Sequence, residues 1–261
     1  MPACETVTLA TPDGPMPAYL ARPDSAGKGG AAKGGEARGG AAKGGAAAKG
    51  GVIVVQEAWG VNHHIQDVAR RFAVAGWDAV APAFFHRQGS PVLDYEDLAS
   101  VMPLLGQLTA EGLAADLTAA VDYLAAAGHP AGNVAVVGFC MGGTVSFYAG
   151  TLHPLGAAVT FYGGGVSQGR FGLPSLVDLA PRLQAPWLGH FGDLNRGIPV
   201  ADVEALRAAT GPLGVPTAVQ RYADADHGFH CDGRPAVYHR AAAGLAWQRT
   251  LGWLDRHAAA A

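Results

Sequence analysis

The sequence predicts an α/β fold in which a mainly parallel central sheet carries helices on both faces. After residue 50, apolar runs of strand length alternate with segments of helical periodicity, the pattern that produces a parallel sheet. The runs 51–55 and 134–137 are apolar throughout, as expected for strands that are buried on both faces. With 261 residues, 49% of them hydrophobic, the chain is long enough for one large core, so we expect residues 1–261 to form a single domain.

The first elements are expected to be two short strands, 5–10 and 16–22, joined by a turn at Pro12-Asp13-Gly14. The segment 25–51 follows, and it contains only Ala, Gly, Lys, Arg, one Ser and one Glu. Because it has no apolar side chain larger than alanine, it cannot bury enough surface to offset the entropy of ordering. We predict a flexible, basic Gly/Ala/Lys-rich insertion within the domain, either a tolerated surface loop or a tether for an unidentified acidic partner.

Capping residues and periodicity mark the remaining elements. Asn62 is typical of a helix N-cap, and Gly76 is typical of the position that follows a helix. Apolar residues recur at helical spacing between residues 113 and 124. The expected strands are 51–56, 77–82, 133–138, 157–162, 186–191 and 217–222, and the expected helices are 62–75, 111–127, 141–152, 202–209 and 237–256.

Composition excludes several classes of function. The net charge of −3 argues against a nucleic-acid partner, because such binders usually carry a dense basic face. The longest apolar runs have the length of strands, so no membrane span is expected. Cys4, Cys140 and Cys231 are too widely spaced for a CxxC metal motif or a disulfide framework, so no metal centre is predicted. The N-terminal residues lack the pattern of a secretory signal, and we expect a cytoplasmic protein.

The strongest chemical signal is Gly138-Phe139-Cys140-Met141-Gly142-Gly143, between an expected strand and an expected helix. Its spacing, glycine two residues on either side of a nucleophile, is that of the nucleophile elbow of α/β-hydrolases, with cysteine in place of serine. The glycines are needed because bulkier residues would collide with neighbouring backbone in so tight a bend. The helix N-terminus should favour the thiolate of Cys140, and the N–H of Met141 should face a developing oxyanion. The alternative is a glycine-rich turn that holds an inert buried cysteine.

A hydrolase of this kind requires a base, which chain order places after the last strands. The sequence contains ten histidines, and His227 stands out because it lies in a short turn just past the last expected strand, Ala225-Asp226-His227-Gly228-Phe229, whereas His86 and His230 could line the pocket. We therefore predict that His227 is the base.

Four segments together are similar to those of the dienelactone hydrolase family, in the family's order. They are residues 56–60 (QEAWG), 81–87 (APAFFHR), 138–143 (GFCMGG) and 227–229 (HGF), and the later CDGR and AWQRTL segments resemble family members as well. The similarity extends from about residue 5 to the C-terminus, apart from the insertion. It implies an α/β-hydrolase fold and the hydrolysis of a small lactone or ester, with no cofactor.

The resemblance also implies a role for each matching residue. Glu57 would be the acidic residue that lies beside the resting thiol and swings away as substrate arrives. The N–H groups of Ala58 and Met141 would form the oxyanion hole, and Arg87 and Arg234 would receive a substrate carboxylate. Cys140 would be the nucleophile and His227 the base.

One position departs from the family pattern. The family's triad acid lies in a segment G-x-x-D-x-x-[IV]-P, but residues 192–199 read GDLNRGIP, which places Asn195 at the acid position. Asn195 could orient His227 through its side-chain carbonyl, or Asp193 could replace it through a shift of the loop. A third reading is a weakened site with slower turnover, because an amide gives less electrostatic support to an imidazolium.

These observations predict a hydrolase that opens a small lactone or ester through a cysteine acyl-enzyme. One alternative is a general carboxylesterase or thioesterase without a preference for carboxylate-bearing substrates. A different alternative is a redox-active thiol protein built on a hydrolase scaffold, because an accessible cysteine of low pKa can also be oxidised.

Overall fold

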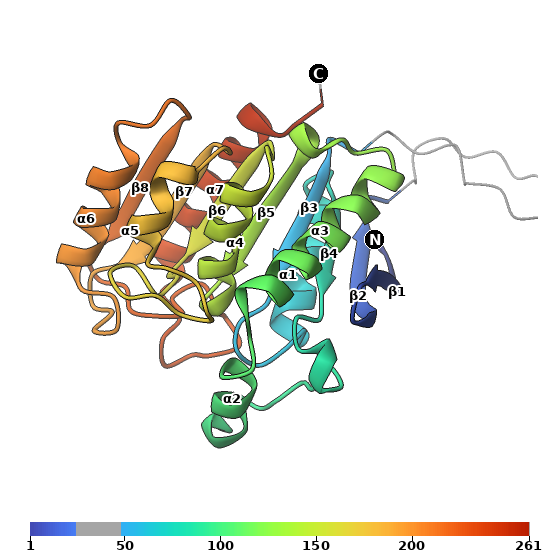
Figure 1. Cartoon of the computed structure of the whole chain (residues 1–261), viewed down its shortest axis with the longest axis horizontal. Coiled ribbons are helices and arrows are strands. Elements are labelled where there is room, and N and C mark those ends of the chain that lie inside the picture. The colour runs from blue at the N-terminus through green and yellow to red at the C-terminus, as the bar shows by residue number, and fades with distance from the viewer. Residues whose placement is uncertain (25–47, 261) are drawn as a thin grey trace, which may run out of the picture.

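The computed structural model describes residues 1–24 and 48–260, in which eight strands form one sheet between two layers of helices (Figure 1). Six neighbouring strands run parallel, and a hairpin formed by the first two strands of the chain is added antiparallel at one edge. The predicted α/β-hydrolase fold with a mainly parallel sheet is confirmed. In sheet order the strands are β1 (Ala3–Thr11), β2 (Gly14–Arg22), β4 (Asp78–Pro82), β3 (Gly51–Val55), β5 (Val134–Phe139), β6 (Ala157–Phe161), β7 (Trp187–Gly192) and β8 (Thr217–Tyr222).

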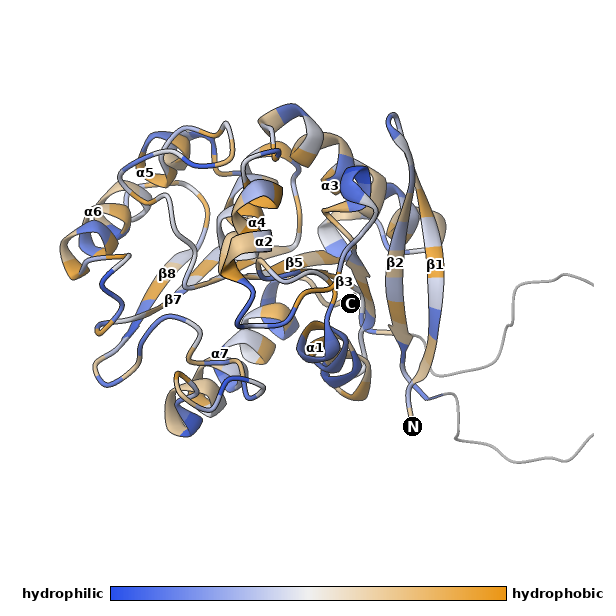
Figure 2. Cartoon of the chain, turned by 90° about the horizontal axis from the view of Figure 1, so that it is seen from below, coloured by the Kyte–Doolittle hydropathy of each residue, from blue (hydrophilic) through white to orange (hydrophobic). Residues whose placement is uncertain are grey.

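Helices cover both faces of the sheet, and each face has its own apolar core (Figure 2). Helices α1 (His63–Val74) and α7 (Arg240–His257) pack on one face. The opposite face is covered by α3 (Ala110–Ala126), α4 (Met141–Leu152), α5 (Leu176–Leu179) and α6 (Val200–Thr210). The central strands β3 and β5 are buried along their whole length, as their continuous apolar sequence predicts.

Local signals explain where the first long helix begins and ends. The side chain of Asn62 accepts a hydrogen bond from the N–H of Ile65 at 3.2 Å, so the predicted N-cap of α1 is confirmed. Gly76, just after the helix, has a φ of +96°, a conformation that glycine adopts without steric cost.

The sequence patterns missed α2 (Leu98–Leu105) and α5, and they placed the start of α7 three residues too early. Helix α2 contains Pro103 and exposes Leu98 and Met102, so it lacks the apolar stripe that marks an amphipathic helix. Helix α7 begins at Arg240 because the ring of His239 caps it, accepting from the N–H of Ala242 at 3.2 Å. Single turns of 3-10 helix occur at His86–Gln88 (η1), Ala131–Asn133 (η2) and Ala180–Arg182 (η3).

The predicted insertion, residues 25–51, lies mostly outside the described residues, but its last residues require a correction. Lys49 donates from its backbone N–H to the carbonyl of Gly76 at 2.8 Å, and its ammonium pairs with Asp255 at 2.8 Å. Gly51 is the first residue of β3. The end of the predicted insertion is therefore part of the folded domain.

Among the described residues, no helix is both long and apolar enough to cross a membrane.

Candidate active site

Cys140 lies at the sharp bend between β5 and α4, where its φ is +57° and its ψ is −117°. A Cβ added to Gly138 would lie 1.8 Å from the carbonyl oxygen of Gly142, and one added to Gly142 would lie 2.4 Å from that of Val55. Both distances are far below van der Waals contact, so the predicted need for glycine on either side of Cys140 is confirmed. With this conformation Cys140 packs against the edge of the apolar core while it lines a cavity at the carboxyl end of the sheet.

The carboxyl ends of neighbouring parallel strands bring the other predicted residues to the same edge. Cys140 follows β5, Asn195 follows β7, and His227 follows β8. All three line one cavity of about 110 Å³. The other lining residues are Leu105, Met141, Thr144, Gly164, Arg170, Phe171, Gly197 and Ile198.

Asn195 contacts His227, but through the opposite end of its amide from the one predicted. Its side-chain nitrogen donates to Nδ1 of His227 at 3.0 Å, and its side-chain oxygen accepts the N–H of Gly197 at 3.0 Å. The prediction that the carbonyl of Asn195 orients His227 is wrong, because the amide nitrogen faces Nδ1 and the oxygen is turned toward the N–H of Gly197. With Nδ1 as the acceptor, a neutral His227 carries its proton on Nε2.

Asp193, the alternative acid, faces another partner. Its two carboxylate oxygens accept from Nε and Nη2 of Arg221, each at 2.8 Å. The proposed loop shift toward His227 is therefore wrong in this structure.

The surroundings of His227 keep its imidazole neutral. Burial lowers its pKa to about 4, and the positive charge of Arg234 acts in the same direction. The nearby carboxylate of Asp226 raises the pKa but does not outweigh burial. At neutral pH only one ring nitrogen of His227 carries a proton. The imidazole can therefore accept a second proton and serve as a base.

The expectation of a resting thiolate is wrong. Desolvation of the sulfur and the negative charge of Glu57 raise the pKa of Cys140 to about 12. The N–H of Met141 donates to the sulfur and lowers the pKa, but burial and the neighbouring carboxylate outweigh this effect of the helix N-terminus. In the resting protein Cys140 is therefore a neutral thiol at physiological pH.

The rate of alkylation measures the protonation state of the Cys140 thiol directly. We expect iodoacetamide to modify Cys140 slowly at pH 7 and progressively faster toward pH 10, because only the thiolate reacts and a raised pKa delays its formation. Mass spectrometry of the Cys140 peptide as a function of pH gives the profile, and the exposed Cys4 in the same sample is the internal control. Full reactivity of Cys140 at pH 6 would contradict the neutral resting thiol.

Glu57 follows β3 and is completely buried. The hydroxyl of Tyr162 donates to its Oε1 at 3.3 Å, while Oε2 has no hydrogen-bond partner among the described residues. Burial raises the pKa of Glu57 above its ordinary value. Its charge acts on Cys140, as an acidic residue near the resting thiol would.

Sequence reasoning missed Tyr162, which joins two parts of the site. Its hydroxyl contacts Glu57, and its ring centroid lies 5.1 Å from that of His227. Its φ of +40° is rare for a residue with a side chain. Its position just after the carboxyl end of a buried parallel strand was the available signal.

The two residues expected to form the oxyanion hole come from neighbouring strands, since Met141 follows Cys140 at the start of α4 and Ala58 follows β3. Ala58 is buried in the loop after β3, the strand that pairs with β5. Gly142 packs against the carbonyls of Val55 and Gln56, which brings that loop against the start of α4.

Arg87 does not reach the cavity, so its predicted role as a carboxylate receptor is wrong. Its guanidinium binds Asp116 of α3 at 2.8 and 2.9 Å and Asp13 of the β1–β2 turn at 2.6 and 2.9 Å. The side chain of Asp116 is completely buried, so its negative charge requires the positive charge of the Arg87 guanidinium beside it. Arg87 therefore holds the hairpin to α3.

Two other arginines lie near the cavity. Arg234 places its guanidinium 4.8 Å from the ring centroid of Trp59, and its charge acts on Glu57, Cys140 and His227. Arg170, which sequence reasoning missed, lines the cavity itself and is exposed. Within the described ranges it forms no ion pair, so it is available to a substrate anion.

Comparison with known proteins agrees with this architecture. Residues 39–258 match the model of the dienelactone hydrolase family. The chain belongs to the dienelactone hydrolase family. It is accordingly a carboxylic ester hydrolase, as the sequence predicted.

Individual relatives of this dienelactone hydrolase family member cover nearly its whole length. A protein of Salmonella typhimurium, provisionally named carboxymethylenebutenolidase, is 36% identical over 93% of this chain and 83% of its own. A protein of Yersinia pestis with the same provisional name is 32% identical over 99% of this chain and 90% of its own. A crystal structure of a provisional dienelactone hydrolase from Klebsiella pneumoniae superposes with a TM-score of 0.84 at 32% identity, covering 98% of this chain and all of that one.

Proposed function

We propose that this hydrolase opens a small lactone or ester through an acyl-enzyme on Cys140. The observation that carries the proposal is that Cys140 and His227 line one cavity, with the sulfur at a nucleophile elbow and the N–H of Met141 beside it. An elbow nucleophile with a neutral histidine in the same cavity is the arrangement that acyl transfer requires.

The reaction begins with removal of the thiol proton. Nε2 of His227 accepts it, the thiolate attacks the carbonyl carbon, and the N–H groups of Ala58 and Met141 stabilise the oxyanion. The ring or ester oxygen leaves and takes the proton from His227. Water, activated by His227, then hydrolyses the thioester and restores the thiol.

The hydrogen bonds of His227 impose a cost on the first step. Its ring proton must move from Nε2 to Nδ1 before Nε2 can accept the thiol proton. The new Nδ1–H would then face the amide N–H of Asn195, whose oxygen is bound to Gly197. We infer that Asn195 slows proton removal, which agrees with the reading of a weakened site.

The acyl-enzyme can be trapped. Rapid mixing with p-nitrophenyl acetate, followed by acid quench and peptide mapping, is expected to find acetyl on the Cys140 peptide together with a burst of nitrophenolate. Turnover with no acyl group on that peptide would overturn the cysteine mechanism. Oxidation of Cys140 without any turnover would instead favour the redox-active thiol protein.

Arg170 supports a preference for substrates that bear a carboxylate. Arg170→Gln is expected to lower kcat/KM for an anionic dienelactone about 10-fold to 100-fold, because a charged hydrogen bond contributes roughly 1.5–3 kcal/mol. Turnover of neutral p-nitrophenyl acetate should change less than about two-fold, since that substrate has no charge to bind. The measurement is steady-state kinetics on both substrates.

The exposed Arg240 supplies the matched control, because Arg240→Gln removes a positive charge far along the chain, at the start of α7. It should leave both rates unchanged. Equal losses for the anionic and neutral substrates in Arg170→Gln would favour a general carboxylesterase or thioesterase.

A further inference from the structure

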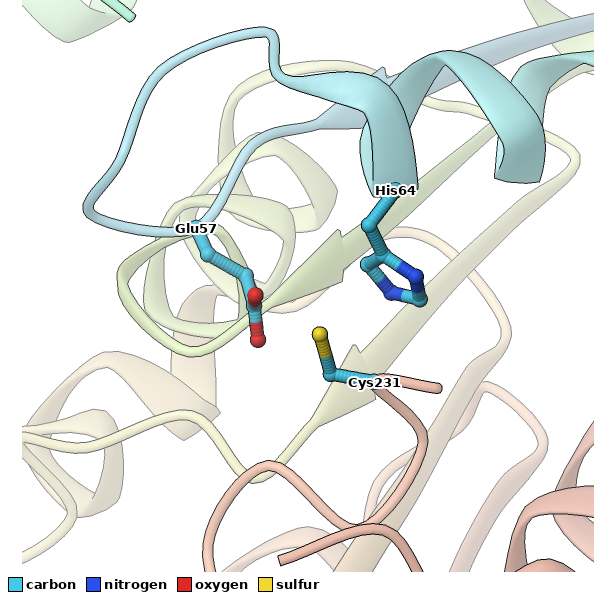
Figure 3. A group of neighbouring side chains, drawn as sticks. All are labelled: Glu57, His64 and Cys231. Atoms are coloured by element: carbon cyan, nitrogen blue, oxygen red, sulfur yellow. The ribbon is translucent and has the colours of Figure 1, made fainter. Parts of the chain in front are cut away.

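Three side chains that could bind a metal ion converge in a buried space next to the active site. Glu57, His64 and Cys231 come from the loop after β3, from α1 and from the segment after β8. One ligand atom of each lies within 4.8 Å of the others (Figure 3), and all three residues are buried. In Figure 3 their side chains point into one common space.

Two of the three carry a buried polar atom that has no protein partner. Oε2 of Glu57 and Nε2 of His64 form no hydrogen bond to any described residue. Leaving a buried polar atom unpaired is costly, so native proteins pair nearly all of them. Both atoms belong to residues of this cluster, so a cation bound there would give each of them a partner.

The surroundings of His64 are those of a metal ligand. Its Nδ1 lies 3.1 Å from Oδ1 of Asp232, which therefore accepts the ring N–H and leaves the lone pair on Nε2. Metal-binding histidines commonly give their other ring N–H to a carboxylate in this way. Arg71 binds the second oxygen of Asp232 and fixes it in place.

We propose that Glu57, His64 and Cys231 form a binding site for a divalent cation of the zinc type. Carboxylate, imidazole and thiolate are together the ligand types that Zn²⁺ and Co²⁺ prefer, and three protein ligands leave a fourth position for water. Metal–ligand bonds of roughly 2.0–2.3 Å require the ligand atoms to approach by about 1 Å, a movement that side-chain rotation supplies.

A surface cleft lies beside this site. A surface cleft of about 290 Å³ is lined by His64 and Asp232 together with Tyr95, whose hydroxyl lies 3.1 Å from the sulfur of Cys231. The cleft is separate from the cavity lined by Cys140.

Cobalt binding tests whether the sulfur of Cys231 is a metal ligand. Untagged, chelator-treated protein titrated with Co²⁺ is expected to bind one equivalent and to develop the near-ultraviolet charge-transfer band of a thiolate–cobalt bond. In the double variant Cys4→Ser/Cys140→Ser, Cys231 is the only thiol, and the ligand set is intact. This variant should retain the whole band. Absence of the band from either protein overturns the proposal.

Zinc affinity, measured by competition with a chromophoric chelator, tests the other ligands. His64→Gln and Asp232→Asn are each expected to weaken Zn²⁺ binding by about 10-fold to 100-fold, Asp232→Asn because it no longer fixes the ring. His63→Gln is the matched control, since His63 is an exposed neighbour on the same helix. Equal affinity in the His64 and His63 variants would refute the site. A melting curve for each variant confirms that it is folded.

Discussion

Replacing Cys140 with alanine is expected to reduce kcat/KM for p-nitrophenyl acetate by at least about 10³-fold, because no other described nucleophile shares the elbow. Serine at the same position should lose nearly as much. Its hydroxyl has a much higher pKa than a thiol, and the tautomer of His227 opposes removal of that proton. Steady-state hydrolysis of the purified variants measures both effects.

Both variants, Cys140→Ala and Cys140→Ser, are expected to remain folded. The backbone at residue 140 has a positive φ with either replacement, so the melting temperature should stay close to that of the parent protein. Cys4→Ser, at an exposed cysteine far from the cavity, is the control and should keep full activity. Undiminished hydrolysis by Cys140→Ala would refute the cysteine acyl-enzyme.

Asn195→Asp is expected to raise kcat/KM by at least about 10-fold. A carboxylate at this position would accept both the N–H of Gly197 and an Nδ1–H of His227, so the imidazole would carry its proton on Nδ1. Nε2 would then be ready to accept the thiol proton. The reverse change in a serine protease triad costs about 10⁴-fold in kcat, which sets the scale.

Two further measurements separate this explanation from a general change in the loop. Because the added carboxylate stabilises the imidazolium, alkylation of Cys140 should shift to lower pH in Asn195→Asp. Asp193→Asn is the matched control, since Asp193 lies in the same loop but binds Arg221 and not His227. An Asn195→Asp variant no faster than the parent would mean that the tautomer does not limit the reaction.

The fold could be predicted from the sequence because its signals are local. The central strands β3 and β5 are continuously apolar, Asn62 marks the start of α1, and the glycines around Cys140 are required by backbone contacts that any nucleophile elbow makes. Helix α2 gave no such signal, because its apolar residues are partly exposed and its sequence has no single buried face.

The active site could be predicted only in part, because several of its properties depend on residues distant in the sequence. The partners of Arg87 come from the β1–β2 turn and from α3, so no local pattern shows that its charge is already bound. The pKa of Cys140 depends on burial and on Glu57, which follows another strand. The amide of Asn195 is oriented by the N–H of Gly197, a detail that residue type alone does not contain.

Cys140 and Tyr162 both have positive φ values, and they stand at the ends of paired strands, β5 and β6. Conformations of this kind cost of order 1–3 kcal/mol each, a large share of the roughly 5–15 kcal/mol that holds a typical domain together. The backbone conformations at these two positions therefore lower the stability of the fold while they place side chains at the candidate active site. A more heat-stable variant would therefore need stabilising changes elsewhere in the chain, because relaxing either backbone would move Cys140 out of the cavity or Tyr162 away from Glu57 and His227.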